Sequence, residues 1–362
     1  MIAMGTLSRY FGLRFLSAVV AVFAGAFVLV AMVDFVEMIR RTQDVPDIST
    51  LVVAKISLYR VPFVTERVLP FAVLVATMFC YLNLSRRLEL VVARAAGISA
   101  WQFIMPAIAI ALLLGIAATA LYNPISAQLR ERSTQLEAEF SQQGGFRTSA
   151  GNFWIRQRSD DGQAIINAKS SRQQGVELGG VTIFRFDPNG TFRDRIEAKS
   201  AVLEPGFWRF DEARIHANGV ASVDRDTYRI KTTLTRAQVG ESFATPETVP
   251  FWQLPKHIEI AENAGLSAVA YRLQYFQLLA LPFYLVAMVL LAAAVSLRFF
   301  RMGGVQKVVL SGVAAGFAIY VLAKITGDVS KAGLLPPLVA AALPPLLGGI
   351  GGFLTLLYQE DG

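Results

Sequence analysis

Long apolar runs, separated by short polar segments, fill both ends of the chain. Each run holds about 16 to 25 residues, close to the roughly 20 that a helix needs to cross the hydrocarbon core of a bilayer. The first three runs are Phe15–Val33, Val68–Leu84 and Trp101–Tyr122. The last three are Leu273–Leu297, Val308–Ala323 and Leu334–Tyr358. The pattern predicts three membrane-spanning helices, an interruption, and three more spanning helices.

The interruption, from about residue 142 to residue 259, has the pattern of a β domain. Charged residues return, and short segments rich in β-branched and aromatic residues alternate between apolar and polar positions, as half-buried strands do. The expected strands are Asn152–Arg158, Gln163–Lys169, Val176–Phe186, Thr191–Leu203, Phe207–Ala217 and Thr227–Thr235. We therefore predict an α-helical membrane protein with six transmembrane helices (3+3) and an inserted all-β domain, a sandwich or jelly roll.

The joining segments set the domain limits. Residues 51–67 mix charged and apolar positions and predict an amphipathic helix at the membrane interface, ahead of the second span. Asn123 and Pro124 are expected to end the third span, and a polar helix is expected at Ser126–Phe140. The predicted division is residues 1–124 for spans one to three, 125–262 for the β domain with flanking helices, and 263–362 for spans four to six.

Basic residues lie unevenly beside the apolar runs. Those on one side of the expected spans are Arg9, Arg14, Arg86, Arg87, Arg94, Arg298, Arg301 and Lys307. The short segments on the other side hold mainly Arg40, Arg41 and Lys331. The positive-inside rule then places both termini in the cytoplasm and the β domain outside. The alternative for the first run is a cleaved signal peptide, but the run is longer than the usual apolar core of such a peptide.

Between the second and third runs, residues 85–99 form a short amphipathic stretch, SRRLELVVARAAGIS. Charged side chains alternate with leucine and valine, and the stretch is too short and too charged to span a membrane. Gly97 is a typical helix stop. On the cytoplasmic side, this stretch is either a helix that lies on the membrane surface or a docking site that another protein binds.

Composition narrows the class of function. Hydrophobic residues make up 54% of the chain and charged residues only 17%, which indicates a membrane protein. The net charge of +7 follows from the uneven basic residues, and no basic patch with interleaved aromatics indicates a nucleic-acid partner. One cysteine, two histidines and the lack of any phosphate-binding or hydrolase motif predict no catalytic residue, metal or cofactor. Any energy source or hydrolytic chemistry is therefore expected to come from another chain.

Charged residues at the outer ends of the spans are the candidates for ligand binding. Arg40, Arg41 and Lys324 are either interfacial anchors or cations that hold an anionic ligand, and the fork of arginine suits phosphate. Asp34 would tune the release of such a ligand. Glu66, at the edge of the second span, is either an interfacial residue or a contact to a polar head group.

Two pairs of glycines in the last spans have the spacing that lets helix backbones approach closely. They are Gly312 with Gly316 and Gly348 with Gly352. Glycine is also common in membrane spans without such a contact. We therefore expect a close helix contact at one of the two pairs and do not assign both.

Several stretches together resemble the LptF/LptG permeases of the lipopolysaccharide export transporter in Gram-negative bacteria, and the resemblance covers nearly the whole chain. These stretches are Arg9–Tyr10, Asp34–Arg41, Arg87–Gly97, Leu178–Phe184, Pro250–Pro255 and Tyr271–Gln274. The segment Glu89-Leu-Val-Val, followed by Gly97, is the most specific of them. Taken together, they look more like the LptG subunit than the LptF subunit.

The resemblance implies a set of partners in the bacterial inner membrane. Two paralogous permeases, LptF and LptG, form a heterodimer around a lipid-facing cavity. A dimer of cytoplasmic ATPases, LptB, binds the helix between spans two and three of each permease. Lipopolysaccharide enters between spans one and five of opposite subunits. It then passes to the periplasmic jelly roll, to LptC and to a bridge toward the outer membrane.

The resemblance also implies roles for particular residues. The ATPase-coupling helix contains Arg87, Glu89, Arg94 and Gly97, and Glu89 matches its acidic residue. These residues are therefore the expected contacts of the ATPase, and the resemblance implies that ATP and its Mg²⁺ bind in that partner and not in this chain.

For the substrate, Arg40 and Arg41 match a basic pair at the outer end of span one that meets lipopolysaccharide phosphates. Asp34 stands where the family pattern can carry a lysine, and an acid there would repel phosphate. Lys324 is then expected to take part of the role of that lysine.

Three other functions stay open at this stage. They are the paralogous LptF subunit, the permease of another ABC exporter for lipoproteins or peptides, and a membrane-anchored β-domain scaffold. Such exporters often have four spans with the external domain after span one, which disagrees with the 3+3 pattern.

Overall fold

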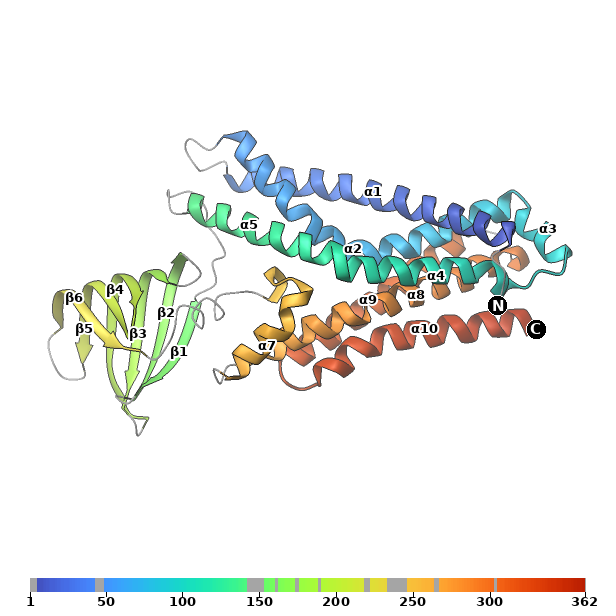
Figure 1. The fold of residues 1–362 in the computed structure, drawn as a ribbon. Helices are drawn as coiled ribbons and strands as arrows, with labels where there is room; N and C mark the ends of the chain where they lie inside the picture. The colour runs from blue at the N-terminus through green and yellow to red at the C-terminus, as the bar shows by residue number, and fades with distance from the viewer. Residues whose placement is uncertain are drawn as a thin grey trace.

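The computed structural model describes residues 5–42, 49–141, 153–159, 162–172, 176–187, 190–217, 222–232, 246–263, 267–302 and 305–361. A long helical bundle carries a β sheet at one end and a short helix, α3, at the other (Figure 1). The N- and C-terminal ends of the chain both lie at the α3 end.

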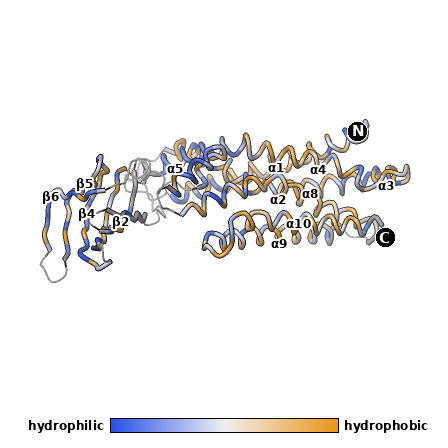
Figure 2. The backbone as a smooth tube through the Cα atoms, turned by 60° about the horizontal axis from the view of Figure 1, so that its bottom comes forward, coloured by the Kyte–Doolittle hydropathy of each residue, from blue (hydrophilic) through white to orange (hydrophobic). Residues whose placement is uncertain are grey.

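Six helices in the described residues are long and apolar enough to cross a membrane. They are built from α1 (Thr6–Thr42), α2 (Thr50–Arg86), α4 (Ala100–Ala117), α8 (Val269–Met302), α9 (Val305–Lys331) and α10 (Pro337–Asp361). Figure 2 shows hydrophobic residues along the length of this bundle and more hydrophilic ones toward α5 and the sheet. The predicted 3+3 arrangement is therefore confirmed.

The second span is longer than the sequence pattern predicts. The expected interfacial helix at residues 51–67 and the apolar run after it form one continuous helix, α2, which includes Pro62 and Pro70. This helix is the best covered of the six, since 72% of its most apolar window is buried, against 11% for α1 and 17% for α9. Helices α1 and α9 therefore present most of their apolar surface outward.

The helix of the third span continues past Asn123 and Pro124, where the sequence predicts that the span ends. A π-helical turn, η1 (Ala118–Tyr122), follows α4, and α5 (Asn123–Ser141) continues from it. Proline has no N–H group, so Pro124 leaves the carbonyl of Ala120 without its helical donor. The indole Nε1 of Trp252 donates to that carbonyl at 3.1 Å, and the helix continues with the polar residues expected at 126–140.

The fourth span contains a proline that is accommodated in the same way. Pro282 lies inside α8 and leaves the carbonyl of Leu278 without its helical donor. The hydroxyl of Thr119, in the π turn, donates to this carbonyl at 2.8 Å. One turn earlier, Gly115 of α4 lies against the backbone of Pro282, so closely that a Cβ there would come within 2.3 Å of the proline Cα.

Both glycine pairs of the last spans make close contacts within the chain. A Cβ on Gly316 of α9 would come within 2.4 Å of Leu74 on α2, and a Cβ on Gly352 of α10 would come within 2.8 Å of the backbone of Leu290 on α8. The prediction of a close helix contact is confirmed, and it holds for both pairs. Helix α9 also extends through Lys324 to Lys331, beyond the expected end at residue 323.

The β domain is a six-stranded antiparallel sheet in which each strand pairs with its neighbour in sequence. The strands are β1 (Phe153–Ser159), β2 (Gly162–Arg172), β3 (Glu177–Phe186), β4 (Phe192–Glu204), β5 (Phe207–Ala217) and β6 (Val223–Lys231). All six predicted strands are found. The last begins four residues earlier than expected, and the end predicted at residues 233–235 lies outside the described residues. The described strands form a meander, without the strand crossing of a Greek-key jelly roll.

Buried side chains occupy one face of the sheet, but their alternation slips by one residue along a line across it. On β3, β4 and β5 the buried pairs Leu178/Val181, Ala198/Ala201 and Phe210/Ala213 are each three residues apart. Each of these strands carries one extra residue at this line, so the same face stays buried on both sides of it while the register between strands is unbroken. Gly180 and Glu212 lie on this line with φ of 61° and 52°, the backbone region that glycine accepts most easily.

A short helical segment brings the chain from the sheet back to the bundle. It consists of η3 (Pro246–Thr248), η4 (Phe251–Gln253) and α7 (Leu254–Asn263). The ring of Phe251 stacks on Tyr275 of α8 with centroids 5.4 Å apart. This contact fixes the return of the chain into the fourth span, as the connector predicted at residues 251–262 requires.

Candidate functional site

The stretch at residues 85–99 is a turn followed by a seven-residue helix, α3 (Glu89–Ala95). Leu88 precedes the helix in the left-handed region, with φ of 59°. At the other end, the amide of Gly97 bonds to the carbonyl of Arg94 and the amide of Ile98 to that of Ala93, at 2.9 and 3.1 Å. With φ of 83° at Gly97, this is a Schellman ending, which the glycine in the sequence predicted.

Buried and polar contacts attach α3 to the bundle. The side chain of Leu90 is 1% exposed and belongs to the main apolar core between the spans. The hydroxyl of Tyr10, on α1, donates to Oε2 of Glu89 at 3.0 Å. Arg14 in turn donates from Nε to the tyrosine oxygen at 3.1 Å. The carboxylate of Glu89 is therefore bound within this chain, and a movement of α3 would act on α1.

The outer face of α3 is apolar and basic. Leu88 and Val92 expose 61% and 67% of their surface, and Val91 exposes 42%. Arg87 and Arg94 are exposed beside them, without an ion pair among the described residues. This face combines uncovered apolar area with a fixed backbone, as a protein-docking surface does. Sequence reasoning identified Arg87, Glu89, Arg94 and Gly97 but missed Tyr10 as the partner of Glu89.

At the opposite end of α1, the predicted basic pair shares one carboxylate. Arg40 and Arg41 both lie 2.9 Å from the carboxylate of Glu37, and their side chains are 73% and 52% exposed. Lys324 lies on α9, where Nζ is 3.5 Å from Asp328 and the side chain is 66% exposed. No ion pair or hydrogen bond between described side chains joins Lys324 to the two arginines, so within one chain they form separate basic positions.

Asp34 faces into the protein rather than toward the two arginines. Its Oδ1 atom lies 3.3 Å from Nε of Arg60 on α2, and its side chain is 11% exposed. Arg60 also lies 3.8 Å from Glu137 of α5, so the pair ties three helices together. The expected repulsion of phosphate by Asp34 is therefore offset by its own cation.

Glu66 forms a junction between the spans and the segment that returns from the sheet. Its carboxylate accepts from Asn123 at 2.8 Å and from Ser126, both on α5. The other side of the Asn123 amide accepts from the backbone N–H of Phe251 at 2.9 Å. Glu66 is 8% exposed, so it is a structural residue and not an open contact for a head group.

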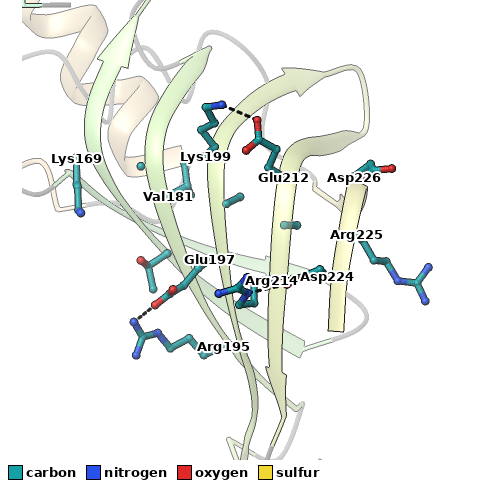
Figure 3. Close-up of a pocket in the computed structure, with 14 residues that line it drawn as sticks. Lys169, Val181, Arg195, Glu197, Lys199, Glu212, Arg214, Asp224, Arg225 and Asp226 are labelled. Carbon is teal, nitrogen blue, oxygen red and sulfur yellow. Dashed lines mark hydrogen bonds and ion pairs between the residues drawn. The ribbon is translucent and has the colours of Figure 1, made fainter. Parts of the chain in front are cut away.

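A polar groove of about 600 Å³ crosses the outer face of the sheet, along the line where the alternation slips (Figure 3). Its basic residues are Lys169, Arg195, Lys199, Arg214 and Arg225, and its acidic residues are Glu197, Glu212, Asp224 and Asp226. Nζ of Lys199 lies 2.6 Å from the carboxylate of Glu212, which raises the pKa of the lysine. Arg214 donates two hydrogen bonds to Asp224, one to each carboxylate oxygen, and these lower the pKa of the aspartate. The charges of this groove are thus largely compensated within it.

The inner face of the sheet carries the apolar side chains. Trp208 and Phe210 are fully buried there, with ring centroids 6.4 Å apart. The indole Nε1 of Trp208 has no hydrogen-bond partner among the described residues. The inner face is therefore built from the sheet's own aromatic and aliphatic side chains.

Comparison with known proteins gives a consistent result. Residues 9–358 match the family model described as lipopolysaccharide export system permease LptF/LptG. The chain is similar to the lipopolysaccharide export system permease protein LptG of Escherichia coli strain K12, with 22% identity over 346 residues and 94% of each chain covered. It is 22% identical to the LptG protein of Haemophilus influenzae over 348 residues, covering 94% of this chain and 95% of that protein.

The match extends across all six spanning helices and the sheet, which is the arrangement on which the sequence resemblance rested. A permease of this family is a multi-pass membrane protein of an export system and not itself an enzyme. The chain therefore belongs to the LptF/LptG family of lipopolysaccharide export permeases.

Proposed function

We propose that this chain is the LptG-type permease of an ABC transporter that extracts lipopolysaccharide from the inner membrane. It pairs with the paralogous permease LptF, and a cytoplasmic LptB dimer hydrolyses ATP for both. The chain passes the lipid through its periplasmic β domain to LptC and a bridge toward the outer membrane. The LptG assignment is favoured over LptF by the two LptG relatives that match over nearly their full length.

The observation that carries this proposal is the construction of α3. Its outer face exposes Leu88, Val91 and Val92, while its inner face is fixed to α1 and to the core through Glu89 and Leu90. A helix that couples an ATPase to a permease must combine an exposed surface for the ATPase with a rigid connection to the spanning helices that move. Tyr10 provides that connection directly to α1, the helix at which the lipid is expected to enter.

Helices α1 and α9 support a lipid pathway shared with a second subunit. They bury the smallest share of their apolar windows of all six spans, 11% and 17%. Exposed apolar side chains on α1 include Val28, Leu29, Met32, Val33 and Val36. Because the outer ends of these helices carry Arg40, Arg41 and Lys324, a lipid with its acyl chains on the apolar surface would place its head-group phosphates beside cations.

The orientation follows from the same assignment. The α3 end, with both termini and Arg9, Arg14, Arg86 and Arg87, faces the cytoplasm. The sheet at the opposite end then lies in the periplasm, where its apolar inner face would receive acyl chains. The side chains of Arg298, Arg301 and Lys307, which also enter this assignment, lie outside the described residues.

Substitution on the outer face of α3 tests the proposal. Val92→Glu places a charge on the exposed apolar face and leaves Leu90 and Glu89 in place, so the permease should assemble in the membrane but fail to retain the ATPase on co-purification. Leu51→Glu is the matched control, since Leu51 is 81% exposed at the opposite end of α2. Full retention of the ATPase and full lipopolysaccharide export by Val92→Glu would contradict the coupling role. Mass spectrometry of co-purified lipid separates this cargo from a lipoprotein or peptide.

A further inference from the structure

A groove of about 310 Å³ runs between α1 and α2 near the α3 end of the bundle. Arg14 and Arg87 stand at its polar end, with Asn83 beside them, and the lining continues past Ala18 to Ala21 and Phe79. From Arg14 to Ala21 the helix rises about 10 Å, since each residue adds 1.5 Å. The groove therefore combines a basic entrance with an apolar floor several carbon atoms long.

The two arginines have no direct ion pair within the part of the chain that the structure describes. No described carboxylate lies within 4 Å of either guanidinium, in contrast to Arg40, Arg41 and Arg60 at the other end of the bundle. Arg14 uses Nε for its bond to Tyr10, and no hydrogen bond to another described residue occupies its two terminal nitrogens. Arg87 is exposed at the C-cap of α2.

The apolar part of the groove is likewise uncovered. Phe79 exposes 59% of its surface on α2, and Ala21 is exposed on the facing side of α1. A soluble anion would meet the arginines but leave this floor open, whereas a hydrocarbon chain alone would leave the arginines unpaired. The occupant that matches both parts is an amphiphile with an anionic head and an extended acyl chain.

We propose that this groove binds an anionic phospholipid of the leaflet at the α3 end, with its phosphate between Arg14 and Arg87 and one acyl chain along Ala21 and Phe79. Arginine binds phosphate through paired N–H groups, and basic pockets between spanning helices on the cytoplasmic side are suited to anionic head groups. The site lies at the opposite end of the bundle from Arg40 and Arg41, so it is separate from the proposed contact with the cargo.

The position of Arg14 connects this site to α3. A phosphate held by the terminal nitrogens of Arg14 would fix its Nε bond to Tyr10, and Tyr10 in turn binds Glu89. An occupied groove would therefore restrict the movement of α3 relative to α1. This consequence, unlike the binding itself, rests on the proposed function of α3.

The test measures lipid bound to the chain, purified together with its partner permease and ATPase. Detergent-solubilised complex is mixed with equal amounts of phosphatidylglycerol and phosphatidylcholine, and the bound lipids are counted by native mass spectrometry. Each arginine near a membrane surface contributes about a fivefold preference for anionic lipid. Arg14→Gln should lower bound phosphatidylglycerol about fivefold, and Arg14→Gln with Arg87→Gln more than tenfold.

Two further variants separate the parts of the site. Arg86→Gln removes the neighbouring charge, which does not line the groove, and should leave the lipid ratio unchanged. Ala21→Trp fills the apolar floor with both arginines intact and should lower phosphatidylglycerol binding while the complex keeps its thermal stability. These variants report on the groove even where the double arginine variant is poorly folded.

Several outcomes would overturn the proposal. They are equal binding of the two lipids by the native complex, unchanged binding in the double variant, and saturation of the site by glycerol phosphate, which lacks the acyl chain. Displacement of phosphatidylglycerol by lipopolysaccharide would show that the groove belongs to the cargo pathway. Because the readout is lipid binding without ATP, it is independent of the coupling test at Val92.

Discussion

The hydroxyl of Thr119 lies 2.8 Å from the carbonyl oxygen of Leu278 and supplies the donor that Pro282 lacks. The two residues come from different spans, 159 positions apart in the sequence. The hydroxyl of Thr326 does the same for the carbonyl of Ala340, four residues before Pro344. In a membrane, where no water can replace a lost donor, such side chains allow prolines inside spanning helices.

Removal of the Thr119 hydroxyl should destabilise the bundle. In Thr119→Val the carbonyl of Leu278 stays buried without a donor, and the expected loss is about 1–2 kcal/mol of the free energy of unfolding. Unfolding of the purified chain in mixed micelles by increasing denaturing detergent measures this change. Thr119→Ser keeps the hydroxyl and should stay close to the native midpoint. A valine variant as stable as the serine variant would show that the bond contributes little.

Contact between Gly115 and Pro282 gives a second prediction. The Cβ of Gly115→Ala would lie 2.3 Å from the Cα of Pro282, so α4 and α8 must separate. Overpacking of this kind costs about 1–3 kcal/mol, and the thermal midpoint should fall by several degrees. Gly25→Ala, on α1, is the control, since nothing beyond the backbone of its own helix lies within 4 Å of the added methyl group. Equal midpoints for the two variants would mean that the helices rearrange at no cost.

The fold could be predicted from the sequence wherever the structure of a segment depends on the residues of that segment alone. Apolar length alone gives the six spans, and alternation gives all six strands to within a few residues. The errors occur at prolines and charges whose partners lie far away in the sequence. Pro124 looks like a helix end because its compensating donor, Trp252, follows 128 residues later, and no local pattern announces that pairing.

The candidate sites show the same limit. Arg40, Arg41 and the stretch at 85–99 were identified from charge and position, and the turn at Gly97 from its residue type. The partner of Glu89 was not identified, because the contact with Tyr10 joins residues 79 positions apart. Asp34 was expected to face a phosphate, since nothing in its neighbourhood in sequence indicates the pairing with Arg60. Roles of these residues in binding ATPase or lipid stay predictions.

Acid should loosen the edge of the sheet through one ion pair. The bond from Arg214 lowers the pKa of Asp224 below its ordinary value of 3.8. A depressed carboxylate pKa stabilises the folded state above the ordinary pKa, and this contribution is lost as pH falls through the lowered value. Amide exchange of β6 should therefore speed up, relative to β3, below about pH 4. Asp224→Asn should show fast exchange at neutral pH already and little further change with acid.

The outer basic pair should contact the lipid cargo. Arg40→Gln with Arg41→Gln removes two exposed cations and leaves the helix intact, so photo-crosslinking of lipopolysaccharide to α1 should fall several-fold while the chain still inserts. Lys331→Gln, an exposed lysine at the end of α9, serves as the control for a general loss of positive charge. Crosslinking at the native level in the double variant would exclude a phosphate contact at these positions.

The bond between Tyr10 and Glu89 should couple α3 to α1. Tyr10→Phe removes the donor and Glu89→Gln removes the charge of the acceptor, so either change should lower lipopolysaccharide release per ATP hydrolysed by the reconstituted complex. If both act through the same bond, the double variant should be no worse than the more severe single one, which a double-mutant cycle measures. Additive losses would instead mean that Glu89 contacts the ATPase independently of Tyr10. Co-purification of the ATPase distinguishes these cases, because loss of the bond alone should leave the exposed face of α3, and hence ATPase binding, unchanged.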